Sequence, residues 1–375
     1  MLYFNHAGTS WPKPAVVSEA VCDAMHVPPN EWGDRFEQAH QAIAVFLGVS
    51  DPEQILLTPG CTSSLSVAIQ GVWIERGKRV LTSHWEHHAL HRPILQLASA
   101  GLQVDYIPSC SHERSAASSL IDLDWLEREC LVGDVGLVAL TAACNVTGDL
   151  LPYEEVVEIA HRHGAPVLID AAQVVGWQRL DLTRLDADLV AFGGHKGLQS
   201  PWGIGGLYFS ERAKMECTSA KCDLPISSEL QERKPPRPGY CDVGSVDQFA
   251  LAGFHAALEW LRQRDDQSDL AKSREQIQRM RRSLEDDDRV SLLGSSNPEL
   301  RMPTLAFSIQ GMSSSTAASR CREQGLIVGS GLHCAPLAHE SLGTESVGAL
   351  RLSVGIGQHD DDVDVAIEIL KSVMD

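Results

Sequence analysis

The sequence predicts an α/β protein with a large domain around a mostly parallel sheet flanked by helices, followed by a small α+β C-terminal domain. Short apolar runs bounded by glycine, proline or polar residues alternate with helical patterns through the middle of the chain. The character of the sequence changes after about residue 210, where a polar stretch begins. The length of 375 residues is enough for two hydrophobic cores.

The large domain owes its predicted sheet to five short apolar segments. They are residues 79–83, 137–141, 166–170, 188–192 and 205–209. Helical patterns such as residues 153–164 lie between several of them. Strands that alternate with helices pair in parallel, so we expect helices on both faces of this sheet.

The C-terminal third begins after residues 211–240, which are polar and predict a long loop. We expect helices over 248–264 and 270–284, a solvated turn at the acidic residues 285–288, and then alternating strands and helices at 304–309, 316–324, 350–354 and 360–373. This pattern predicts a large domain at 15–255 and a small domain at 256–375, with the N-terminal segment 1–14 packing near the small domain.

Composition narrows the class of partner. The net charge of −19 repels nucleic acid and anionic membranes, so we expect neither as a partner. The chain lacks a long apolar run and a basic N-terminal leader, and we therefore expect a cytoplasmic enzyme. The ten cysteines form no C-x-x-C pair, which argues against a zinc ribbon or a thioredoxin-like site.

Lys196 and Asp170 are candidates for holding a cofactor. Lys196 lies among glycines directly after a predicted strand, where desolvation would lower its pKa as a Schiff-base amine requires. Asp170 ends another strand, at the edge where α/β folds bind ligands, and could pair with the pyridine nitrogen of pyridoxal 5′-phosphate (PLP). The alternatives are a surface lysine and an aspartate that caps the next helix.

Two further segments suit ligand binding. Gly60, Cys61 and Thr62 precede an apolar helix, whose N-terminus can bind an anion or can simply be capped. The histidines between His84 and His91 are spaced by three and four residues, which fits either a metal site or a ring that stacks on an aromatic cofactor. We expect no metal, because no other ligand set completes a recognisable site.

Cys334 and Arg351 are candidates for contact with substrate. Cys334 lies in a glycine-containing loop beside His333, which suits a reactive thiol as well as a structural cysteine. Arg351 opens a predicted strand and could grip a carboxylate in bidentate fashion, or form a surface ion pair.

The order of these segments resembles the class V (fold type I) PLP enzymes, specifically the cysteine desulfurase and selenocysteine lyase family, over essentially the whole chain. The matching segments are 5–14, Glu86-His87-His88-Ala89, Asn145-Val146-Thr147-Gly148, Asp170-Ala171-Ala172-Gln173, His195-Lys196 and Gly244-Ser245. The resemblance implies a seven-stranded sheet and a homodimer with active sites at the subunit interface.

The resemblance also implies a role for each matching residue. Catalysis falls to Lys196 as the Schiff base, to Cys334 as the sulfur acceptor and to His87, which stacks on the cofactor ring. The implied PLP-binding residues are Cys61, Thr62, His87, Asn145, Asp170, Gln173, His195, Lys196 and, from the partner subunit, Ser245. The implied substrate-binding residues are Arg351, Asn145 and Ala7.

Three positions depart from the family pattern. Gly193 stands where the family usually has serine, and Gly329 where group II desulfurases usually have arginine. Leu332 replaces the first histidine of the group II G-H-H-C-A loop. The short spacing between Cys334 and Arg351 still resembles group II.

The resemblance implies a PLP-dependent cysteine desulfurase, which converts L-cysteine to L-alanine, transfers sulfur to Cys334 as a persulfide and passes it to a sulfur-acceptor protein. The alternatives are a C–S lyase that eliminates sulfur from cysteine, cystine or a thioether and releases pyruvate, and a class V aminotransferase or epimerase. A metal hydrolase built on the histidine cluster is an alternative from another class.

Overall fold

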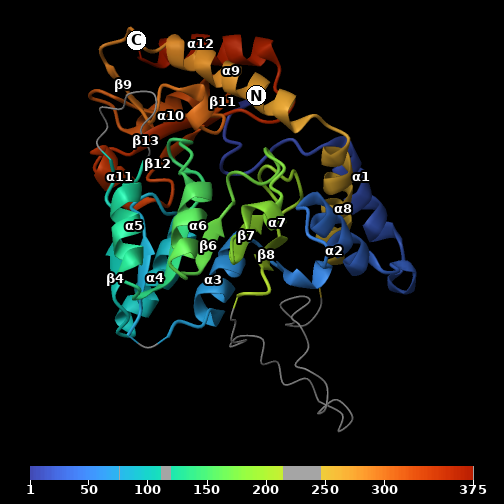
Figure 1. Ribbon diagram of the computed structural model, residues 1–375. Coiled ribbons are helices and arrows are strands. Elements are labelled where there is room, and N and C mark those ends of the chain that lie inside the picture. Colours follow the sequence, from blue (N-terminus) through green and yellow to red (C-terminus); the bar gives the residue numbers. More distant parts are fainter. Residues whose placement is uncertain (76, 111–119, 214–245, 375) are drawn as a thin grey trace.

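The computed structural model describes residues 1–75, 77–110, 120–213 and 246–374. Within these residues, the largest sheet has seven strands and confirms the predicted α/β class (Figure 1). Its order is β2 (Ile55–Thr58), β8 (Gly205–Phe209), β7 (Leu189–Gly193), β6 (Val167–Asp170), β5 (Val135–Thr141), β3 (Arg79–Thr82) and β4 (Val104–Tyr106). The sheet is mostly parallel, as predicted, since only β8 runs antiparallel to its neighbours β2 and β7.

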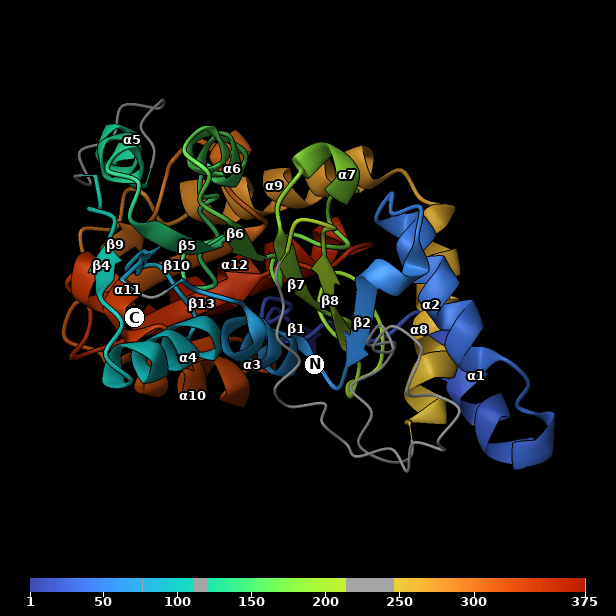
Figure 2. The ribbon, with the colours of Figure 1, turned by 60° about the horizontal axis from the view of Figure 1, so that its bottom comes forward.

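Helices cover both faces of this sheet. In Figure 2, α5 (Leu123–Leu131), α6 (Tyr153–Arg162) and α7 (Leu182–Leu185) lie on one side, and α3 (Cys61–Gly71) and α4 (His88–Ser99) lie on the other. Consecutive strand residues point to opposite faces. Leu137 therefore packs among the buried apolar side chains of α3 and α4 on one face, whereas Val138 packs among those of α5 and α6 on the other face. This two-sided burial explains why the strands are continuously apolar.

Three helices cover the β2 edge of the large sheet. They are α1 (Ala15–His26), α2 (Arg35–Phe46) and α8 (Gln248–Arg262), and α8 packs against the other two. Asp247 begins α8 by accepting hydrogen bonds from the backbone N–H groups of Phe249 and Ala250. The proposed domain boundary at residue 255 falls inside α8, and the division itself stays a prediction.

The C-terminal region has its own sheet and core. Its antiparallel strands follow the order β12 (Gly329–Gly331), β13 (Ala349–Ser353), β10 (Thr304–Ile309) and β9 (Val290–Leu293). The helices of this region are α9 (Asp266–Arg282), α10 (Ser314–Glu323), α11 (Pro336–Leu342) and α12 (Asp360–Met374). At the other end of the chain, β1 (Leu2–Tyr3) pairs with β11 (Leu326–Ile327), and Phe4 lies in the core of this region.

Most predicted elements are confirmed within a few residues. The predicted helix 270–284 begins earlier, at Asp266, because Asp265 caps it by accepting from Ser268 N. Residues 285–288 lie in the predicted turn. Short 3-10 segments at Pro29–Glu31, Pro52–Gln54 and Pro298–Leu300 complete the described elements. The predicted loop 211–240 lies mostly outside the described residues. In the part of the chain that the structure describes, no helix combines the length and apolarity needed to span a bilayer.

Candidate active site

The predicted site residues meet in one cavity at the carboxyl ends of β3, β5, β6 and β7. The cavity measures about 510 Å³, a size typical of small-molecule sites. Its lining includes Ala7, Cys61, Thr62, His87, Asn145, Asp170, Gln173, His195, Lys196, Cys334 and Arg351. Ser245 lies outside the described residues, so its predicted role stays a prediction. The fold thus gathers residues from both ends of the chain around a single space.

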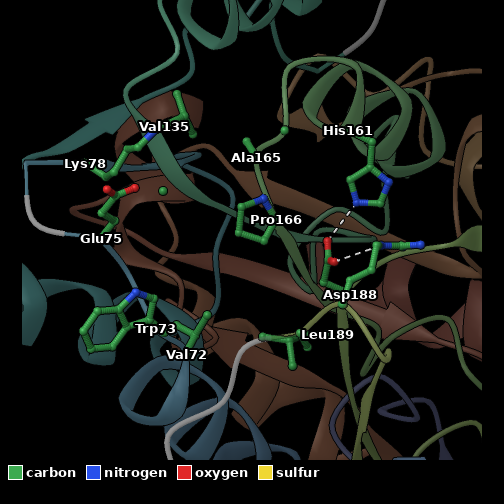
Figure 3. Close-up of a pocket in the computed structure, with 14 residues that line it drawn as sticks. Val72, Trp73, Glu75, Lys78, Val135, His161, Ala165, Pro166, Asp188 and Leu189 are labelled. Atoms are coloured by element: carbon green, nitrogen blue, oxygen red, sulfur yellow. Dashed lines mark hydrogen bonds and ion pairs between the residues drawn. The ribbon is translucent and has the colours of Figure 1, made fainter.

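A second cavity lies at the opposite, amino-terminal edge of the large sheet (Figure 3). It measures about 520 Å³ and lies beside Val135 and Leu189, the first residues of β5 and β7. Its buried carboxylate is already paired, because Asp188 accepts a 2.8 Å hydrogen bond from His161 and a 3.4 Å bond from Arg212. This cavity contains none of the predicted site residues, so the candidate chemistry lies in the first cavity.

Lys196 lies in a tight turn that follows β7. The backbone N–H of Gln199 donates to the Lys196 carbonyl oxygen at 2.9 Å, and Ser200 N donates to Gly194 O at 2.9 Å. Burial lowers the pKa of the Lys196 amine, and this effect exceeds the opposing attraction of Asp170. Compared with an exposed lysine, the site therefore shifts the amine toward its neutral form, which acts as a nucleophile or a base.

Asp170 is the last residue of β6, and its side chain is buried. Its Oδ1 accepts from Ala172 N at 3.0 Å and from the Cys61 thiol at 3.5 Å. Burial raises the pKa of the Asp170 carboxyl, and burial also raises the pKa of Cys61, which keeps its thiol protonated. A Cβ at Gly193 would lie 3.3 Å from the Cys61 Cβ, so the glycine at this position leaves room for Cys61.

His87 is the N-cap residue of α4. The backbone N–H of Ala89 donates to His87 Nδ1 at 3.0 Å. Burial lowers the pKa of His87 to about 4, so the ring is neutral at physiological pH. Because Nδ1 accepts a hydrogen bond, the single ring proton is on Nε2.

The N-terminus of α3 lies at the cavity wall without a side-chain cap. The N-cap residue is Gly60, so the first N–H groups of this helix are available to an anion. A Cβ at Gly205 would lie 2.8 Å from the Gly60 Cα, so glycine is required for β8 to pass this close. Thr62 adds an exposed hydroxyl in the first turn. These features are suited to a phosphate group.

His195 links the N-terminal segment to the lysine turn. Its carbonyl oxygen accepts hydrogen bonds from Thr9, from the backbone and side chain of Ser10, and from Lys13. Its ring atom Nδ1 is buried without a hydrogen-bond partner among the described residues, and burial lowers the pKa of the ring to about 4. A neutral ring therefore faces the same cavity as Lys196.

Asn145 and Gln173 connect the cavity wall to other segments. Asn145 Nδ2 donates to the His333 carbonyl at 2.7 Å, while its Oδ1 is buried with no partner in the described part of the chain. Gln173 Nε2 donates to the Ala7 carbonyl at 3.1 Å. Ala7 N in turn donates to Ser353 Oγ at 2.8 Å, which attaches the N-terminal segment to β13.

Cys334 is exposed in a loop whose backbone is strained. His333 has a φ of 48° and Cys334 a φ of 58°, a left-handed conformation that non-glycine residues seldom adopt. The Cys334 carbonyl accepts a hydrogen bond from His88 N at 2.7 Å, and the His333 carbonyl accepts one from Asn145 Nδ2. The loop is therefore held from two sides while its thiol stays accessible, as strained functional loops often are.

Arg351 is buried on β13 with its guanidinium in the cavity wall. Its Nη1 donates to the Asn145 carbonyl at 2.7 Å and its Nη2 donates to Asn5 Oδ1 at 2.9 Å. Its Nε has no hydrogen-bond partner in the described residues. Burial lowers the pKa of Arg351 to about 10, so the group is still a cation at neutral pH.

Sequence reasoning missed several residues of the cavity. Trp202 lines it and donates from Nε1 to Thr9 Oγ1 at 2.8 Å, and His333 lines it beside Cys334. The signal that the sequence offered for Trp202 was its place directly before the glycine-rich residues 203–206 and six positions after Lys196. In the described ranges, no group of three or more His, Cys, Asp or Glu residues is arranged to bind a metal. The metal-hydrolase alternative therefore gains no support from these residues.

Comparisons with known proteins agree with this arrangement. The family model described as aminotransferase class-V matches residues 13–365. A probable cysteine desulfurase of Pseudomonas aeruginosa is 31% identical, over 91% of this chain and 83% of that protein. A probable cysteine desulfurase of Vibrio cholerae is 27% identical over 100% of this chain and 94% of that protein.

Solved structures show the same fold. A cysteine desulfurase from Escherichia coli superimposes with a TM-score of 0.86 at 25% identity and covers 99% of this chain and 94% of its own. A cysteine desulfurase from Thermococcus onnurineus NA1 gives a TM-score of 0.87 at 24% identity over 100% of this chain and 94% of its own, which supports the fold alone. These likenesses confirm the fold type I prediction. With a family model that matches nearly its whole length, the chain belongs to the aminotransferase class-V family.

Proposed function

We propose that this protein is a PLP-dependent cysteine desulfurase that converts L-cysteine to L-alanine and accepts the sulfur on Cys334 as a persulfide. The observation that carries this proposal is the exposed Cys334 thiol on a strained loop, at a cavity that also contains Lys196 and the buried cation Arg351. The names of the relatives agree with it, since several are called cysteine desulfurases.

The cavity residues fit PLP. Several buried polar atoms around the cavity have no partner in the described residues, among them His195 Nδ1 and Asn145 Oδ1, and the uncapped start of α3 suits a phosphate. Lys196 would hold the cofactor covalently and Asp170 would pair with its ring nitrogen. Cys61, Thr62, His87, Asn145, Gln173 and His195 would complete the binding site. When bound, PLP supplies an electron sink for the substrate α-carbon.

The chain's own groups account for the remaining steps. Arg351 binds the substrate carboxylate, with Asn145 and Ala7 beside it. The Lys196 amine, once free, removes the α-proton as a general base, which its lowered pKa favours. The Cys334 thiolate attacks the substrate sulfur, so that an S–S bond forms while the substrate Cβ–S bond breaks. The electron pair of the Cβ–S bond goes to Cβ, and protonation of Cβ together with return of a proton to Cα gives alanine.

The proposal includes a homodimer, a separate sulfur-acceptor protein and a cytoplasmic location. Trp202 lines the cavity and yet is 68% exposed in the single chain. An exposed tryptophan ring at the mouth of a cavity suits burial by a second copy, because tryptophan is enriched at protein interfaces. Light scattering after gel filtration tests this, and a monomer at micromolar concentration would contradict it.

The product of the reaction with L-cysteine tests the proposed function. The PLP-loaded protein is incubated with L-cysteine, and alanine and pyruvate are measured. We expect alanine from the wild type, a loss of alanine release in Cys334→Ala, and unchanged release in Cys22→Ala, since Cys22 is an exposed thiol on α1. Undiminished alanine release in Cys334→Ala refutes the role of this cysteine, whereas pyruvate and ammonia would identify an elimination lyase.

A further inference from the structure

Cys61 is the first residue of α3, and its side chain reaches the end of β6. Its thiol donates to Asp170 Oδ1 at 3.5 Å, although the two residues are 109 positions apart. The contact is possible because α3 lies against β6 and β7, with its first turn at the wall of the cavity that contains Lys196. A Cβ at Gly193, the last residue of β7, would lie 3.3 Å from the Cys61 Cβ. The glycine therefore leaves room for the thiol beside Asp170.

The Cys61 thiol is suited to donate a hydrogen bond and not to act as a nucleophile. Burial, followed by the negative charge of Asp170, raises the pKa of this thiol well above its usual range, so the thiol keeps its proton at neutral pH. A thiol is a weak donor, but a charged acceptor strengthens the hydrogen bond. Cys61 thus differs from Cys334, which is exposed.

The two carboxyl oxygens of Asp170 have different surroundings. Oδ1 accepts hydrogen bonds from Ala172 N at 3.0 Å and from Cys61. Oδ2 accepts no hydrogen bond in the part of the chain that the structure describes, and Asp170 lines the cavity. Burial raises the pKa of Asp170, and the two hydrogen bonds to Oδ1 oppose this rise. The protein therefore occupies one oxygen of the carboxylate and leaves the other for a ligand.

We propose that Cys61 is a positioning residue that acts on the cofactor through Asp170: its thiol holds Oδ1, leaves Oδ2 for the PLP ring nitrogen, and favours the ionised carboxylate, so that the ring proton stays on that nitrogen. A hydrogen bond to a carboxylate lowers its basicity. Without the thiol, Asp170 would attract the ring proton more strongly and the ring would become less positive. The inference rests on the proposed function only in assigning PLP to this cavity.

The charge of the PLP ring can be measured through Lys196 without turnover. The nitrogen that joins Lys196 to PLP loses its proton as the pH rises, and this loss changes the visible absorbance. A positive ring lowers the pKa of this nitrogen, because like charges repel each other. The pH midpoint of the absorbance change should therefore rise when the ring becomes less positive.

Two substitutions of Cys61 in the PLP-loaded protein separate its hydrogen bond from its packing. Cys61→Ala and Cys61→Ser remove nearly the same volume, but only the serine keeps a donor. We expect Cys61→Ala to raise the midpoint by about 0.3–1 pH unit, as the loss of one hydrogen bond to a charged group produces. Cys61→Ser should return the midpoint to the wild-type value or below it. Cys130→Ala removes a buried thiol on α5, away from this cavity, and should leave the midpoint unchanged.

The outcomes of this titration are distinct. Equal midpoints in Cys61→Ala and Cys61→Ser, or a wild-type midpoint in Cys61→Ala, overturn the proposal. If either variant fails to load PLP, Cys61→Val and Cys61→Thr form a second pair of equal shape in which only threonine is a donor, and equal midpoints in that pair overturn the proposal as well. A wild type without the visible absorbance of lysine-bound PLP refutes both this inference and the cofactor assignment. A protein that shows the expected midpoints but releases pyruvate refutes the desulfurase function alone.

Discussion

Gly176 supports the turn that contains Lys196, and replacing it with alanine should damage both stability and the site. The residue has a φ of 92°, and an added Cβ would lie 2.1 Å from the Gly197 carbonyl carbon and 2.3 Å from Leu198 N. These are backbone atoms, so they cannot rotate away as the end of a side chain could. Gly176→Ala therefore forces the lysine turn to move.

The expected loss of unfolding free energy in Gly176→Ala is the sum of two separate costs. A non-glycine residue at positive φ costs about 1–2 kcal/mol, and overpacking against neighbours that relax costs about 1–3 kcal/mol more. Gly164 provides a control with the backbone cost alone, because its φ is 73° and an added Cβ would meet nothing within 4 Å. We expect Gly164→Ala to lose about 1–2 kcal/mol of unfolding free energy, and Gly176→Ala about 2–5 kcal/mol.

Urea unfolding of the PLP-loaded variants measures this difference. The visible absorbance of lysine-bound PLP provides a second measurement, which should fall in Gly176→Ala and stay normal in Gly164→Ala because only the first contacts the turn. The reasoning is refuted if Gly176→Ala is no less stable than Gly164→Ala, or if it binds PLP through Lys196 as the wild type does.

Three further predictions concern charge. Burial lowers the pKa of several histidines to about 4, so the unfolded chain binds protons at a higher pH than the folded protein does. The stability that these neutral rings contribute should be fully present above pH 6.5 and should be lost as the pH falls toward 4. A thermal midpoint that is equal at pH 7 and pH 5 would contradict this. Arg351→Lys keeps the charge but loses the planar fork, so KM for L-cysteine should rise by about 10-fold to 100-fold with PLP still bound, and an unchanged KM would exclude the carboxylate contact. Arg79 forms ion pairs with Asp105, Glu129 and Asp134. Arg79→Met should therefore reduce the free energy of unfolding, measured in urea, by about 2 kcal/mol. A variant as stable as the wild type would show that this network contributes nothing.

The sequence by itself determined the large-domain strands and the residues at their carboxyl ends. Asp170 and Lys196 were predictable because each follows an apolar run of the right length, and parallel strands bring such ends to one edge. The motifs also identified the family, which the matched family model confirms. Local pattern was sufficient for these features because each depends on a few consecutive residues.

Only the tertiary structure decided how distant segments complete the cavity. The Asn145–His333 hydrogen bond joins residues 188 positions apart, and the Asn5–Arg351 bond joins residues 346 positions apart. The neutral partner of Arg351 and the strained backbone at Cys334 depend on these contacts. No periodicity or spacing records which side chains meet across such separations, because folding of the whole chain brings them together.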